Sequence, residues 1–78
     1  MSEFENPVAP LKRFLRLRQV QEITGKSKSS IYEDITNGRF PRPVPLGEAA
    51  NSPVAWLEDE IAAWQADRIA RRTKQVAV

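Results

Sequence analysis

The residues best suited to bind another molecule form a short polar run, Lys28-Ser29-Ser30, at the start of an apolar helical pattern. Hydroxyl side chains and one cation can approach phosphates and base edges closely, and free N–H groups at a helix start favour anions. The run ends a basic block: residues 11–28 hold six cations and one acid, a charge of +5, while residues 33–60 carry −4. The six cations are Lys12, Arg13, Arg16, Arg18, Lys26 and Lys28. Such a basic face is typical of nucleic-acid binders, although a solvated surface of mixed charge is the alternative.

Other kinds of chemistry lack the necessary residues. The chain has no cysteine and no histidine, which removes zinc ligation, Ser-His or Cys nucleophiles and the usual general base near neutral pH. We therefore rank an enzyme last and expect no cofactor and no metal. Its 78 residues suit one domain. No apolar run approaches the ~20 residues that span a bilayer, and the N-terminus lacks the basic start of a signal peptide, so we expect a cytoplasmic protein without membrane contact.

Two short helices are predicted to present the polar run. Val20 and Ile23 lie three apart on one face of the first helix, and Ile31 and Ile35 lie four apart on one face of the second. Gly25 lies between them and can adopt the left-handed conformation that ends a helix. Two helices across a short turn with glycine are typical of a helix-turn-helix, in which the second helix enters the major groove. An ordinary helical hairpin fits the spacing alone equally well.

The ends of the second helix are also marked. Ser27 offers a side-chain oxygen to cap its start, and Asn37-Gly38 closes it, which gives a recognition helix over about 28–37. At the start of the first helix, near Arg18, no Ser, Thr, Asp or Asn stands at the cap, so its first N–H groups have no local acceptor.

The flanking segments complete a winged fold. Residues 1–10 read as a flexible arm, and residues 11–17 as an extended piece whose Phe14 or Leu15 packs in the core. After Gly38, three alternate prolines exclude a helix and a central strand. Residues 54–56 can then run back antiparallel to residues 44–46 as a small hairpin, the wing. A plain linker is the alternative for this proline-rich stretch.

The longest helix is predicted from Leu57 onwards. Leu57, Ile61 and Trp64 fall at i, i+4 and i+7, and Ile69 lies near the same stripe. Acids fill its first turn and Arg68, Arg71, Arg72 and Lys74 its last turns, an order that complements the helix dipole. We interpret Trp56 and Trp64 as core anchors rather than base-stacking platforms. We prefer dipole complementation for the basic end to an extra phosphate contact, and we expect residues 75–78 to fray.

Four stretches at consistent spacing resemble the AlpA-type prophage transcriptional regulators. They begin at Phe14 (FLRLRQV), Thr24 (TGKSKSSIY), Gly38 (GRFPRPV) and Val54 (VAWLEDEIAAW), so the resemblance covers about residues 14–72. It implies a mainly α fold with a small β-hairpin: a MerR- or excisionase-like winged helix-turn-helix of three helices plus wing, over residues 11–74. Family members commonly carry a basic residue after the tyrosine and often an arginine before the Val-Ala-Trp strand. This chain has Glu33-Asp34 and an acidic or uncharged wing tip at those places.

The resemblance implies double-stranded DNA as the partner. Lys28, Ser29, Ser30 and Tyr32 would face DNA from the recognition helix, and Arg39 and Arg42 would flank the groove at the base of the wing. Glu33 could accept from a cytosine amino group. With nearby polar and basic residues, the candidate DNA-binding set is Arg18, Lys26, Ser27, Lys28, Ser29, Ser30, Tyr32, Glu33, Arg39 and Arg42.

Three functions remain open on the sequence. The first is a sequence-specific DNA-binding regulator of transcription in a prophage or other integrated element. The second is an excisionase that binds and bends attachment-site DNA, with self-association on DNA and an integrase as partner. The third, suggested by the acids Glu33-Asp34 and by the acidic or uncharged wing tip, is a protein-interaction adaptor that has kept the fold and lost DNA binding.

Overall fold

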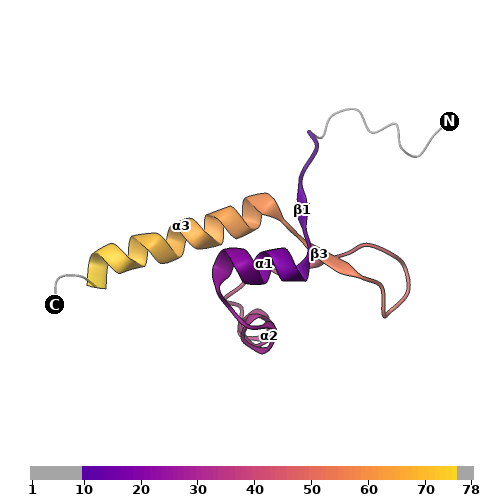
Figure 1. Ribbon diagram of the computed structural model, residues 1–78, viewed down its shortest axis with the longest axis horizontal. Coiled ribbons are helices and arrows are strands. Elements are labelled where there is room, and N and C mark those ends of the chain that lie inside the picture. The colour runs from indigo at the N-terminus through magenta and orange to yellow at the C-terminus, as the bar shows by residue number, and fades with distance from the viewer. Residues whose placement is uncertain (1–9, 76–78) are drawn as a thin grey trace.

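The computed structural model describes residues 10–75, and over these residues it contains three helices and a three-stranded antiparallel sheet (Figure 1). The elements follow in the order β1 (Phe14–Leu15), α1 (Leu17–Thr24), α2 (Lys28–Thr36), β2 (Val44–Pro45), β3 (Val54–Leu57) and α3 (Glu58–Gln75). The predicted fold, three helices plus a hairpin wing, is confirmed. Nearly all of the predicted arm over 1–10, and residues 76–78 of the predicted frayed end, lie outside the described residues.

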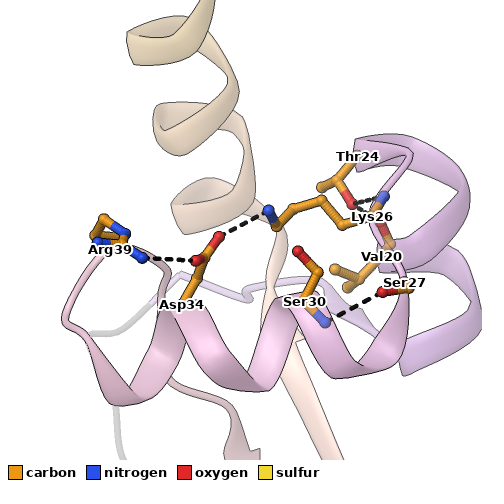
Figure 2. Close-up of polar contacts among 7 residues, drawn as sticks. All are labelled: Val20, Thr24, Lys26, Ser27, Ser30, Asp34 and Arg39. Carbon is orange, nitrogen blue, oxygen red and sulfur yellow. Dashed lines mark hydrogen bonds and ion pairs between the residues drawn. The ribbon is translucent and has the colours of Figure 1, made fainter.

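The turn between α1 and α2 is built by Gly25 and Thr24. Gly25 has φ +74° and its amide donates to the carbonyl of Gln21 at 2.8 Å, so the left-handed helix end predicted from the sequence is confirmed. The Thr24 hydroxyl donates to the Val20 carbonyl at 2.7 Å and accepts from the Lys26 amide at 3.2 Å (Figure 2). The turn is therefore held by hydrogen bonds on both sides of the glycine.

Both ends of α2 are capped. The Ser27 hydroxyl accepts from the Ser30 amide at 3.1 Å, which confirms the predicted N-cap (Figure 2). At the other end Gly38 has φ +74°, and the next amide, that of Arg39, donates back to the Asp34 carbonyl at 2.7 Å. This pattern is a Schellman motif, for which glycine is the least strained residue.

The start of α1 uses a different device. The N-cap is Arg16, and the side-chain oxygen of Gln19 accepts from its backbone amide at 2.8 Å, which is half of a capping box. The Arg16 guanidinium donates to the Val54 carbonyl at 3.2 Å and so ties the start of α1 to β3.

Strand β3 lies in the middle of the sheet, with the order β1-β3-β2 and antiparallel pairing on both sides. Leu15 pairs with Trp56, and Val44 pairs with Ala55. The second pairing is the predicted wing hairpin, which is therefore confirmed.

The core is formed by one residue from almost every element. Its buried members are Leu15, Val20, Ile31, Phe40, Ala55, Trp56 and Ile61. Trp56 is 0 % exposed, its indole N–H donates to the Pro41 carbonyl at 3.0 Å, and the Tyr32 ring meets it edge-on at 6.2 Å. Phe40 meets Trp64 edge-on at 5.1 Å. Both tryptophans pack on the core, as predicted, although Trp64 is only half-buried.

Three apolar residues differ from the sequence prediction. Leu57, expected to begin the last helix, is the last residue of β3, because it pairs with Phe14; α3 begins at Glu58. Ile23 shares a face with Val20 in the sequence pattern but is 43 % exposed. Ile69 is 53 % exposed, since the core ends near the first half of α3.

Candidate nucleic-acid interface

The outer face of α2 is the polar surface of the predicted recognition helix. It consists of the exposed residues Lys28, Ser29, Tyr32, Glu33 and Thr36. Positions 29, 32, 33 and 36 follow the i, i+3, i+4, i+7 spacing of one helical face. Ile31, on the opposite side, is fully buried and Ile35 packs on the core, so the helix is held by its isoleucines with its polar residues outward. The start of α2 also leaves the Lys28 and Ser29 amides without intrahelical acceptors.

The two other serines of the candidate set belong to the frame of α2. The Ser27 hydroxyl is occupied as the cap, and Ser30 is half-buried. In Figure 2 the side chains of Ser30 and Asp34 point to the same side of α2, towards α3 rather than along the outer face. Of the three serines, Ser29 alone therefore lies on the outer face.

Asp34 binds two of the candidate cations (Figure 2). Its carboxylate lies 2.7 Å from the Lys26 ammonium and 3.4 Å from the Arg39 guanidinium. The Lys26 and Asp34 side chains are only 21 % and 19 % exposed, whereas Arg39 is 65 % exposed. The hydrogen bond from Lys26, supported by the nearby charge of Arg39, holds the pKa of Asp34 below its ordinary value. Asp34 is therefore largely shielded and paired, whereas the adaptor hypothesis assumed that it faces outward from α2.

This ion pair changes the electrostatics of α2. Because Asp34 faces two cations, it adds no net negative charge to the outer face, where Lys28 and Glu33 are the charged residues. It also means that Lys26 is held in place and largely shielded, while Arg39 keeps most of its guanidinium in solvent.

The remaining candidate cations are exposed and stand apart from this cluster. Arg18 lies on α1 and Arg42 in the loop before β2. At the wing tip, residues 46–53 carry one charged residue, Glu48. The two sides of the tip lie close together, because a Cβ atom added to Gly47 would lie 2.7 Å from the Ser52 hydroxyl oxygen. The wing therefore supplies no cation of its own to a phosphate.

Sequence reasoning did not include α3 in the site, yet α3 borders it. A hollow between α2 and α3 is lined by Lys26, Asp34, Arg39, Trp64 and Arg68, and an adjoining hollow adds Gly38, Asp67 and Arg71. The sequence does indicate which residues of α3 lie together, because the spacing of Trp64, Arg68 and Arg71 at i, i+4 and i+7 places them on one face of the helix.

Among residues 10–75, no three His, Cys, Asp or Glu side chains gather closely enough to hold a metal ion. Within these residues no helix has the length and apolar composition that crossing a membrane requires.

The helical pair, its polar outer face and the hairpin define the class: a small winged helix-turn-helix protein. Residues 13–69 match the family described as "Prophage CP4-57 regulatory protein (AlpA)", and the chain belongs to that family. It is also similar to "Uncharacterized protein ORF88" of Enterobacteria phage P4, with 45 % identity over 76 residues, covering 87 % of this chain and 83 % of that protein. No solved structure matches it significantly. The resemblance drawn from the four motifs is confirmed, and the family is one of prophage regulatory proteins rather than of enzymes.

Proposed function

We propose that this protein is a sequence-specific DNA-binding regulator that acts on a promoter of a prophage or another integrated element in the cytoplasm. In this proposal α2 enters the major groove and its outer face reads the bases. The observation that carries it is the division of α2, with Ile31 buried and Ser29, Tyr32 and Thr36 exposed. Membership of a prophage regulatory family supports the same conclusion.

The structure weakens the main reason for an adaptor without DNA binding. That hypothesis depended on two adjacent acids facing outward from α2 and on an acidic or uncharged wing tip, and the second feature remains. Asp34 instead faces Lys26 and Arg39, which leaves Glu33 as the single acid on the outer face. One glutamate there is compatible with base recognition, because a carboxylate can accept from a cytosine amino group.

Protection mapping on the element's own DNA tests the proposal directly. We expect a discrete protected site upstream of a promoter. Several adjacent sites inside an attachment site would instead support the excisionase alternative, with copies of the chain lined up beside an integrase. No protected site in either region, together with tight binding to a protein partner, would overturn both and favour the adaptor.

Lys28→Ala provides the matched mutational test. Lys28 is exposed at the start of α2, so its loss should weaken binding and lower the salt slope of log K by about one. Lys12→Ala is the control: it removes the same charge from an exposed lysine that pairs with Asp59 at the start of α3, at 2.8 Å. Equal effects of the two variants would show that net charge matters and that the start of α2 does not contact the duplex.

A further inference from the structure

The hollow between α2 and α3 has the composition of an anion site. It lies where α2 ends, because Gly38 and Arg39 follow that helix directly, and α3 contributes Trp64, Arg68 and Arg71. The part lined by Lys26, Asp34, Arg39, Trp64 and Arg68 has a volume of about 260 Å³, well above the ~30 Å³ that one molecule occupies in liquid water. The edge-on contact with Phe40 at 5.1 Å holds the Trp64 ring that forms one wall.

The charges around this hollow do not cancel. Four cations line its two parts, Lys26, Arg39, Arg68 and Arg71, against two acids, Asp34 and Asp67. Both acids are already bound: Asp34 by Lys26 and Arg39, and Asp67 by Arg71 at 2.9 Å.

Two guanidinium groups are left to bind an anion. Arg68 pairs with no acid among residues 10–75. Arg39 meets Asp34 only at 3.4 Å and is 65 % exposed, so most of its five N–H donors face solvent. A phosphodiester carries one negative charge, and guanidinium groups bind phosphate oxygens in a geometrically matched, charge-assisted way.

The position of the hollow relative to α2 indicates which phosphate of the DNA backbone would reach it. In Figure 1 the wing and the far end of α3 extend in opposite directions, with α2 between them. A helix in the major groove is flanked by a backbone strand on each side, and half to two-thirds of protein–DNA hydrogen bonds go to phosphate and sugar. The wing tip carries no cation, whereas α3 brings Arg68 and Arg71 to the hollow beside the end of α2.

We propose that Arg68, together with Arg39, binds a backbone phosphate of the DNA at the edge of the major groove, beyond the C-terminal end of α2. This inference depends on the proposed DNA binding and adds a contact on α3. The basic end of α3 then does more than complement its helix dipole. Trp64, held by Phe40, forms one wall of the site before DNA arrives.

The test compares Arg68→Gln with Arg72→Gln. Both variants remove one arginine charge from exposed positions on the same helix, but Arg72 lines neither part of the hollow. DNA binding is measured over a range of salt concentrations. We expect Arg68→Gln to bind roughly tenfold more weakly at low salt and to lower the salt slope by about 0.9, and Arg72→Gln to stay close to the unsubstituted protein.

Phosphate-ethylation interference supplies a readout that a general loss of charge would not move. For the unsubstituted protein, ethylating one phosphate at the edge of the protected site should block binding. For Arg68→Gln that single interference should vanish while the others remain. If the unsubstituted protein binds no specific DNA, the proposed function fails and this inference falls with it. If it binds, and the two variants share one slope and one interference pattern, the α3 phosphate contact alone is wrong.

Discussion

Replacing Asp34 by asparagine should strengthen DNA binding. Asp34→Asn keeps the size of the side chain but removes the charge that holds Lys26 at 2.7 Å and Arg39 at 3.4 Å. Lys26 then becomes available to a phosphate, whereas Arg39 is already free enough to bind one in the unsubstituted protein. Each added phosphate contact steepens the plot of log K against log salt by about 0.9. Asp34→Asn releases one further cation, Lys26, so we expect this slope to steepen by about 0.9.

The size of this effect is measurable. A fourfold rise in salt, for example from about 50 to about 200 mM, costs each contact roughly 3.5-fold in affinity. The variant should therefore bind more tightly than the unsubstituted protein at low salt and lose that advantage as salt rises. Titration of labelled operator DNA by fluorescence anisotropy at several salt concentrations gives both quantities, and circular dichroism confirms that the variant is folded.

Asp59→Asn is the matched control for this prediction. Asp59 also pairs with a lysine, at 2.8 Å, but it lies in the first turn of α3 and outside the hollow beside α2. An equal increase in affinity for the two variants would mean that only net charge matters. An unchanged slope for Asp34→Asn would refute the idea that Asp34 restrains cations that DNA could otherwise use.

Two further predictions concern stability. The pKa of Asp34 is lowered in the folded state by Lys26 and then Arg39, so its ionised form contributes stability above the unfolded pKa near 3.8, and this contribution is lost as pH falls through the lower folded value. Urea unfolding at a pH below the folded pKa of Asp34 should therefore show a loss of stability that is smaller in Asp34→Asn than in the unsubstituted protein. The same loss in both proteins would mean that other carboxylates cause it. Ser27→Ala removes the cap of α2 and should cost about 1 kcal/mol in the free energy of unfolding, whereas Ser29→Ala, two positions further on and outside the cap, should cost much less. A similar cost for both serines would argue against the cap.

The parts of the fold that depend on local chemistry could be predicted from the sequence. Gly25 and Gly38 adopt the left-handed conformation, and Ser27 caps α2, because each depends on neighbours within five positions. The wing could be predicted because the prolines allow only an edge strand, which needs a partner such as residues 54–57. The one local device that was overlooked is the Gln19 side chain three positions after the N-cap of α1.

What the sequence did not predict depends on how the helices are placed against one another. Ile23 is exposed because α1 is short and the core reaches only the side of Val20. From the sequence, Asp34 is expected to oppose DNA binding by the recognition helix, because no local pattern indicates that Lys26, eight positions earlier, pairs with it. Helical periodicity places Arg68 on the same face of α3 as Trp64, but it does not indicate that α3 passes the end of α2, which is what brings Arg68 into the candidate site.

Trp56 supports both elements that would touch a duplex. Its ring contacts Tyr32 of α2, its N–H binds the segment leading into the wing, and its strand carries the hairpin. Because one buried side chain joins these parts, α2 and the hairpin cannot move independently, and the distance between them is fixed. A duplex bound as proposed has to match that distance, and any bend or twist that this requires costs more in stiff base steps than in flexible ones. Part of the choice between binding sites would then come from the rigidity of the protein, at base pairs that no side chain reaches.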